Sequence, residues 1–221
     1  MERKHPLAEC ENCPLFEGGK FCPSAGAENA SLVVVGDVPS VADVRSGEPF
    51  TGPAARLFKH VTDYHGFDAE EIFYTHACLC RPQGISAPPK TAIVACRPRL
   101  LAEIENHRVG ELPVVALGNG AALALLGQEK VMNLRVGPPK QSPYGDFKVV
   151  PTVHPAACMR QADQFPNVIL DVGKVKADVQ PWREPDYVVS EGVDHAVALL
   201  DAIDERATAN GTPLVVDIEV D

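Results

Sequence analysis

The sequence predicts an α/β fold, a three-layer α/β/α arrangement in which helices cover both faces of a central, mostly parallel β-sheet. Short apolar segments of strand length alternate along the chain with longer segments of helical character. This order is typical of parallel sheets whose strands are joined by helical crossovers. The first such segment, residues 32–36 (LVVVG), is continuously apolar, as expected for a strand buried on both faces.

The other elements follow in chain order. Residues 53–64 are predicted to form a helix, because Pro53 suits a first helical turn and Gly66 lies beyond the end. Residues 72–77 (IFYTHA) have the composition of a second strand. After it we expect a helix over 91–107, a strand over 114–117, an Ala/Leu-rich helix over 119–126 and a last strand from 149 to 154.

Polar residues stand where three of the predicted strands end. The pairs are Gly36-Asp37, Thr75-His76 and His154-Pro155. In open α/β sheets, ligands bind beyond the carboxyl ends of the strands. The sequence therefore predicts a functional site at this edge of the sheet.

The net charge of −10 is concentrated near the C-terminus. Residues 184–221 carry −9, whereas residues 1–183 carry only −1. The main part of the chain is thus nearly neutral and is compatible with a local basic face for nucleic acid.

The composition also bears on location. No run of about 18 apolar residues is present, so no membrane-spanning helix is predicted. The N-terminal segment MERKHPLAEC lacks the apolar core of a secretion signal. We therefore expect a cytoplasmic protein, in the host cytoplasm if a phage encodes it.

Cysteine spacing suggests a metal site. The chain has seven cysteines, and an odd number without a secretion signal favours thiols and metal ligation over disulfides. Cys10 and Cys13 form a C-x2-C pair, and Cys80 and Cys96 are separated by fifteen residues. Thiolates gathered from distant segments typically hold a metal. The alternative is that these are scattered buried cysteines acting as small hydrophobic residues.

Five sequence blocks carry the most specific signal. They are GDVPSVADVRSGEPFTG (36–52), THACLCRP (75–82), ACRPRLL (95–101), VALG (115–118) and PTVHPAACMR (151–160). In this order they resemble the motifs of the iron–sulfur (family 4) uracil-DNA glycosylases. With the leading cysteine pair, the resemblance covers residues 10–160. It implies a uracil-DNA glycosylase-like domain over residues 1–180, DNA as partner, and a [4Fe-4S] cluster held by Cys10, Cys13, Cys80 and Cys96. Cys22, Cys78 and Cys158 would then be non-ligands.

The resemblance also implies roles around the predicted pocket. Phe50 would stack on a base extruded from DNA, and Val38 would line the same pocket. His154 would donate a hydrogen bond to the pyrimidine O2 and favour departure of the base as an anion. Asp37 and Asp43 occupy two glutamate positions of the family, where a carboxylate orients water or stabilises positive charge on the sugar. Both are one methylene shorter than glutamate.

DNA contacts are implied beyond the pocket. Met159 would wedge into the base stack and Arg160 would meet phosphate. Further phosphate candidates are Arg56, Lys59, Arg81, Arg135 and Lys140. Taken singly, each of these cations is more often an ordinary solvated charge.

His76 departs from the family pattern, which has asparagine at this position. An amide offers an acceptor and two donors at one planar end, whereas a neutral imidazole has one donor and one acceptor on separate ring nitrogens. We therefore expect that discrimination of uracil from other bases is weakened or altered. The pocket would then bind a modified pyrimidine, or it would bind no base at all. An alternative is that His76 acts as a nucleophile. It is less favoured, because a free imidazole is a weak nucleophile without activation.

The C-terminal part is predicted to be a linker and an incomplete fragment over residues 181–221. Its pattern is βαβ-like, with a strand at 187–189, a helix at 193–207 and a strand at 214–218. The stretch PLVVDIE (213–219) resembles the first motif of the 3′–5′ exonuclease domain of family A DNA polymerases. A DNA polymerase, in cis or in trans, is therefore a candidate partner.

Three functions are consistent with these observations. The leading hypothesis is a DNA glycosylase that hydrolyses the N-glycosidic bond of uracil or a related modified pyrimidine. The alternative is a non-catalytic DNA-binding module that uses the same fold and cluster to place a polymerase of phage type. A zinc-stabilised α/β domain is the third, and colour separates it, because zinc gives no visible absorption whereas an iron–sulfur protein is brown.

Overall fold

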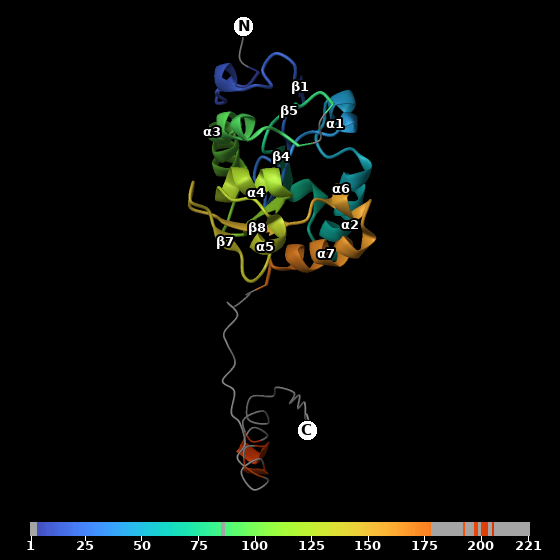
Figure 1. Cartoon of the computed structure of the whole chain (residues 1–221), viewed down its shortest axis with the longest axis vertical. Helices are drawn as coiled ribbons and strands as arrows, with labels where there is room; N and C mark the ends of the chain where they lie inside the picture. The colour runs from blue at the N-terminus through green and yellow to red at the C-terminus, as the bar shows by residue number, and fades with distance from the viewer. Residues whose placement is uncertain are drawn as a thin grey trace. The chain divides into compact units, whose positions relative to one another are not determined.

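The computed structural model describes residues 4–84 and 87–177, and in the C-terminal part residues 192, 197, 198, 200–202 and 205. The chain divides into two compact units, Met1–Pro181 and Trp182–Asp221, and Figure 1 shows its course. The predicted strands at 187–189 and 214–218 and the polymerase-like motif lie outside the described residues. In the predicted helix 193–207, the described residues are helical.

The first unit contains a six-stranded sheet of order β2-β4-β3-β6-β8-β7. The four central strands are parallel, whereas the two edge strands are antiparallel to their neighbours. In spatial order the strands are β2 (Ala25–Gly26), β4 (Ile72–His76), β3 (Leu32–Gly36), β6 (Val114–Leu117), β8 (Lys148–Thr152) and β7 (Lys140–Gln141). The predicted mostly parallel sheet is thus confirmed.

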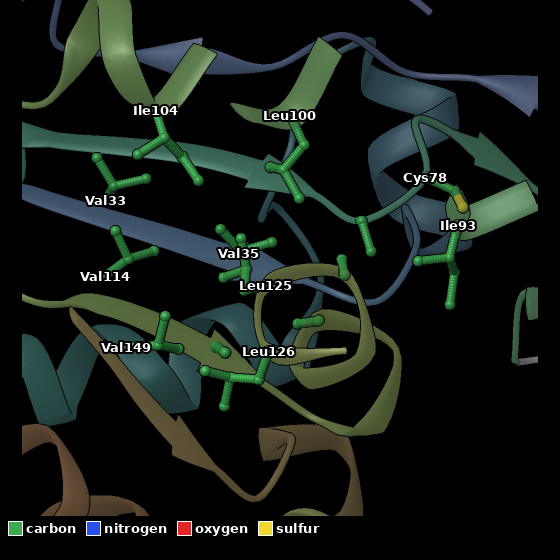
Figure 2. Packing of buried hydrophobic residues seen from close by; sticks show 14 of the residues in the cluster. Val33, Val35, Cys78, Ile93, Leu100, Ile104, Val114, Leu125, Leu126 and Val149 are labelled. Atoms are coloured by element: carbon green, nitrogen blue, oxygen red, sulfur yellow. The ribbon is translucent and has the colours of Figure 1, made fainter. Parts of the chain in front are cut away.

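Four longer helices cover the two faces of the sheet. They are α2 (Pro53–Tyr64), α3 (Lys90–His107), α4 (Asn119–Leu126) and α7 (Phe165–Gly173). Val33 and Val35 pack with apolar side chains of α3 and α4, including Leu100 and Leu125 (Figure 2). Leu32 and Val34 point to the opposite face and pack with α2 and α7 side chains, among them Phe58, Val61, Val168 and Val172. This is the predicted three-layer fold, and it follows from the period-2 alternation of a strand buried on both faces.

Shorter elements complete the unit. A separate two-stranded sheet pairs β1 (Lys20–Phe21) with β5 (Cys80–Arg81). The short helices are α1 (Val41–Ser46), α5 (Val131–Leu134), α6 (Pro155–Cys158) and the 3-10 turns η1 (Cys10–Asn12), η2 (Ala69–Glu71) and η3 (Ala162–Gln164). Within the part of the chain that the structure describes, no helix is both long and apolar enough to cross a membrane.

The sheet topology gathers the polar strand ends. Gly36 pairs with His76 at the ends of β3 and β4, and Leu117 pairs with Thr152 at the ends of β6 and β8. Because all four strands run in one direction, the residues that follow them lie along one edge. Asp37, His76 and His154 therefore come from one edge of the sheet, as expected.

Candidate active site and cysteine site

A pocket of about 240 Å³ opens beyond the carboxyl ends of the parallel strands. We call it the base pocket, and its lining comes from the ends of β4 and β6, the α1 segment, the start of α2 and the start of α6. The lining residues are Val38, Ser40, Asp43, Phe50, Gly52, Pro53, Ala54, Ala55, His76, Leu117, His154, Pro155, Ala156 and Met159. Six predicted site residues are among them. Its apolar walls with a few polar groups are typical of small-molecule sites.

Phe50 provides an aromatic wall of the base pocket. Its ring centroid lies 4.8 Å from that of Tyr74 and 5.0 Å from that of His76, with the His76 ring stacked at an interplanar angle of 28°. Its backbone φ is +57°, a left-handed conformation that costs a non-glycine residue about 1–3 kcal/mol. Gly36 makes room for this arrangement, because a Cβ there would lie 2.8 Å from His76 Cδ2 and 3.2 Å from Phe50 Cζ.

His154 is held in one orientation by the start of α6. It is the N-cap residue, and its Nδ1 accepts a hydrogen bond from the backbone N–H of Ala156 at 3.1 Å. Burial lowers the pKa of His154, although Asp37 opposes the shift. In the neutral ring an accepting Nδ1 leaves the proton on Nε2. His154 therefore has an N–H donor available on Nε2.

Asp37 is not among the lining residues of the base pocket. Its Oδ1 accepts a hydrogen bond from the backbone N–H of Ala121, in the first turn of α4, at 2.8 Å. A Cβ at Gly118 or Gly120 would lie within 2.6 or 2.8 Å of the carboxylate oxygens, so both glycines allow its close approach. Burial raises the pKa of Asp37, while His154 and the α4 backbone oppose the shift.

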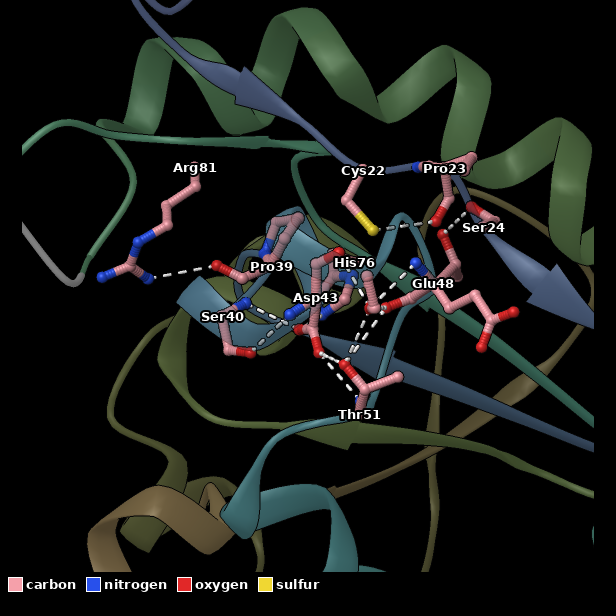
Figure 3. A network of polar contacts seen from close by, with 12 residues as sticks. Cys22, Pro23, Ser24, Pro39, Ser40, Asp43, Glu48, Thr51, His76 and Arg81 are labelled. Carbon is pink, nitrogen blue, oxygen red and sulfur yellow. Dashed lines mark hydrogen bonds and ion pairs between the residues drawn. The ribbon is translucent and has the colours of Figure 1, made fainter.

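Asp43 lines the pocket and also caps α1 (Figure 3). Oδ2 accepts from the Ser40 backbone N–H at 2.6 Å, and Oδ1 accepts from the backbone N–H and hydroxyl of Thr51 at 2.8 and 2.9 Å. Burial raises the pKa of Asp43, but these hydrogen bonds outweigh it and lower the pKa overall. Asp43 is therefore a fixed, ionised carboxylate at the pocket wall.

His76 is 3% exposed at the end of β4. Its Nε2 lies 3.9 Å from Asp43 Oδ2, and its buried Nδ1 has no hydrogen-bond partner among the described residues. Burial lowers the pKa of His76 to about 3, against the opposing effect of Asp43. The ring is therefore neutral and offers no amide-like pair of adjacent donor and acceptor atoms.

Of the predicted DNA contacts, only Met159 lines the pocket, and its side chain is 57% exposed at the end of α6. Val38, predicted to bind the base, also lines the pocket. Arg160 follows Met159 and is exposed. Arg56 is exposed on α2 and is not a lining residue.

The four predicted ligand cysteines line one small cavity. Cys10 comes from η1, Cys13 follows it, Cys80 lies in β5 and Cys96 in α3; Cys78 also lines this cavity, whereas Cys22 and Cys158 do not. Within residues 4–84 and 87–177 no group of three His, Cys, Asp or Glu side chains has metal-binding geometry. The donor set nevertheless fits a thiolate-ligated cluster, because these four thiols come from three segments of the chain, share one cavity and form no disulfide.

Arg99 is a buried residue for which no role was predicted from the sequence. It is 0% exposed, pairs with Glu103 at 2.8 Å and donates to the backbone oxygen of His76 at 2.7 Å. Its Nη2 also lies 3.4 Å from Cys96 Sγ. Two sequence signals were its place in the motif block 95–101 and the i, i+4 spacing to Glu103, a spacing that occurs on most solvated helices.

Comparison with known proteins gives one family and several relatives. Residues 23–173 match the model of the uracil DNA glycosylase superfamily. A type-4 uracil-DNA glycosylase of Pyrobaculum aerophilum is 27% identical over 169 residues, covering 73% of this chain and 85% of the relative. A type-4 uracil-DNA glycosylase of Thermotoga maritima is 27% identical, covering 79% and 91%. One from Saccharolobus solfataricus is also 27% identical, covering 69% and 74%.

Proposed function

The chain belongs to the uracil-DNA glycosylase superfamily, and from this premise we propose that it hydrolyses the N-glycosidic bond of uracil or a related modified pyrimidine in DNA. It is accordingly a hydrolase of the glycosylase type. The observation that carries the proposal is the convergence of the Phe50 ring and the His154 imidazole on one pocket. A base must leave the duplex to reach such a site.

His154 supplies charge stabilisation to the leaving base. Its Nε2–H donates to the pyrimidine O2, where negative charge develops as the bond to the sugar breaks. The hydrogen bond from Ala156 to Nδ1 keeps the proton on Nε2 and fixes the ring. Phe50 packs against a face of the base, and Val38 closes the pocket beside it.

The two aspartates act at different places. Asp43 is ionised at the pocket wall, where a carboxylate stabilises positive charge developing on the sugar and orients the attacking water. Asp37 does not line the pocket and acts through His154, whose imidazole it influences electrostatically. Of the two, Asp43 is the carboxylate that faces the reaction.

His76 sets the specificity. A neutral, buried imidazole offers a single donor at most toward the imide edge of uracil. A pyrimidine altered at that edge therefore competes better here than in a pocket with an amide.

A [4Fe-4S] cluster is the proposed cofactor, held by Cys10, Cys13, Cys80 and Cys96. When bound, it supplies a structural cross-link between η1, β5 and α3. Cys80 follows β4, the strand that ends at His76, by a few residues. The cluster thus braces the segments next to the base pocket.

The test is base release from oligonucleotides by purified, cluster-loaded protein. Excision leaves an alkali-labile abasic site in substrates that contain U:G, U:A, single-stranded uracil or 5-substituted uracils. His154→Ala is expected to lower the rate about 10²–10³-fold, the usual cost of one such donor. His60→Ala, a change at an exposed histidine of α2 outside the pocket lining, is the matched control. No abasic site on any of these substrates would refute the proposal.

A further inference from the structure

A hollow larger than the base pocket lies on the other side of α1. Its volume is about 690 Å³, and its lining residues are Lys20, Val41, Val44, Arg45, Arg81, Pro82, Gln83 and Gly84. We call it the basic groove. No acidic residue is among those lining residues. Among the described residues, none of its three cations forms an ion pair with a carboxylate.

Two of the cations face each other across a strand pair. Lys20 of β1 is the direct partner of Arg81 of β5 in the antiparallel register, and both side chains line the groove. Like charges directly opposite each other destabilise a strand pair. Arg81 is also held in place, because its Nη1 donates to the backbone oxygen of Pro39 at 3.1 Å. An anion in the groove would relieve this repulsion.

The groove and the base pocket share a wall. Helix α1 contributes Val41, Val44 and Arg45 to the groove, whereas Ser40 and Asp43 at its start line the base pocket. Figure 1 shows α1 beside the β1 and β5 strands. A nucleotide strand that enters the base pocket therefore has its next phosphates within reach of the groove, because successive nucleotides are only a few ångströms apart.

We propose that the basic groove binds the phosphodiester backbone of the DNA strand next to the nucleotide whose base enters the base pocket. This inference rests on the proposed function of that pocket. The Arg45 and Arg81 guanidinium groups suit two phosphate oxygens at once, and Lys20 acts as a point charge. Val41 and Val44 give the deoxyribose an apolar floor. Cys80 precedes Arg81 in β5, so the cysteine site braces the strand that presents this cation.

Binding to DNA at varied salt tests the proposal without requiring catalysis. The probe is a fluorescent oligonucleotide with a tetrahydrofuran abasic analogue, single-stranded and in duplex, titrated with full-length, cluster-loaded protein. Lys20→Gln and Arg45→Gln are each expected to weaken binding and to reduce the slope of log K against log salt by about 0.7 on single strands or 0.9 on duplex. The matched control is Lys148→Gln, at the start of β8 and at the opposite end of the sheet from the pocket.

Two further readouts keep the test decisive. Lys20→Gln removes one of the facing like charges, so its melting temperature without DNA is expected to equal or exceed that of the wild type. An unchanged salt slope in both variants, or competition by inorganic phosphate as effective as by DNA, would overturn the proposal. If DNA binding by the wild type depends on salt as expected but the protein releases no base, the proposed glycosylase function is wrong, whereas phosphate binding by the basic groove is still supported. If the wild type releases base and both variants keep the wild-type salt slope, the proposal that the basic groove binds the DNA backbone is wrong.

Discussion

Arg99 donates a hydrogen bond from Nη2 to the backbone carbonyl oxygen of His76 across 2.7 Å. The same nitrogen lies 3.4 Å from Cys96 Sγ, and Nη1 donates to Thr75 Oγ1 at 2.7 Å and Glu103 Oε2 at 2.8 Å. One fully buried side chain thus connects the cysteine site with the strand end that presents His76 to the base pocket. The position of His76 depends on this network as well as on the β3–β4 register.

Replacement of Arg99 by methionine is expected to lower the free energy of unfolding by about 3–5 kcal/mol. The change removes one partner of a buried ion pair and leaves the Glu103 carboxylate without its cation. Urea denaturation of cluster-loaded protein measures the loss.

A second substitution distinguishes the ion pair from simple packing. Arg99→Met with Glu103→Leu removes both charges, and the double variant is expected to recover a large part of the stability, since an apolar replacement of a buried pair is often neutral. Arg108→Met is the control, at the half-buried C-cap of α3, because Arg108 forms no ion pair among the described residues. A single variant as stable as the wild type would show that the pair contributes little.

Gly36→Ala is expected to damage the base pocket. The new Cβ would lie 2.8 Å from His76 Cδ2, closer than real contacts allow, and the two aromatic rings would have to shift. We expect a loss of about 1–3 kcal/mol in stability together with slower base excision. Gly18→Ala is the matched control, because its Cβ would meet only the Gln83 side-chain nitrogen at 3.8 Å. Equal excision rates for the two variants would contradict the expectation.

His76→Asn is expected to raise excision of uracil relative to 3-methyluracil, which lacks the N3–H of the imide edge. The amide presents an acceptor and a donor to the imide edge, and each added hydrogen bond is worth about 0.5–1.5 kcal/mol, or roughly 2- to 12-fold in rate. Single-turnover excision of paired substrates measures the ratio. His76→Leu, which offers neither group, is the control. If the Asn and Leu variants have the same ratio, the imidazole does not set the specificity.

The same histidine predicts how stability depends on pH. The pKa of His76 is about 3 in the folded protein, against 6.5 for an ordinary histidine. Between these values the unfolded chain binds more protons than the folded one, so the free energy of unfolding falls as pH decreases from about 6.5 toward 3. Above about pH 6.5, His76 is neutral in both the folded and the unfolded chain and no longer lowers the free energy of unfolding. The lowered pKa of His154 makes stability depend on pH in the same direction. Urea midpoints between pH 4 and 8 should show a shallower dependence in His76→Asn than in the wild type.

Elements with a strong periodic pattern could be predicted from the sequence, whereas the short elements could not. Strand Leu32–Gly36 and helix Pro53–Tyr64 have the predicted bounds, because a doubly buried strand and a capped helix each leave a local signal. The two-residue strands β1 and β5 leave none, since their pairing is decided by distant segments. The facing of Lys20 and Arg81, and hence the basic groove, was therefore invisible in the sequence.

The candidate site shows the same division. Motif positions predicted which residues line the base pocket, including Phe50 and His154. They did not predict that Asp43 would be fixed by Ser40 and Thr51 or that Asp37 would bond to the α4 backbone and not line the pocket. Those outcomes depend on side-chain hydrogen bonds formed after the elements pack.

Removal of single cysteines tests the cluster and its ligand set. Alanine at Cys10, Cys13, Cys80 or Cys96 is expected to lower iron and sulfide content from about four atoms of each per chain and to bleach the brown colour. Cys78→Ala is the sharpest comparison, because Cys78 lines the same cavity but is proposed not to be a ligand. Cys158→Ala, at a buried cysteine outside that cavity, controls for the loss of a buried thiol. If Cys78→Ala loses iron while one of the four proposed ligands can be replaced without loss, the ligand set must be reassigned to include Cys78. Zinc in a colourless protein as purified would exclude the cluster itself, since a filled d shell gives no visible absorption.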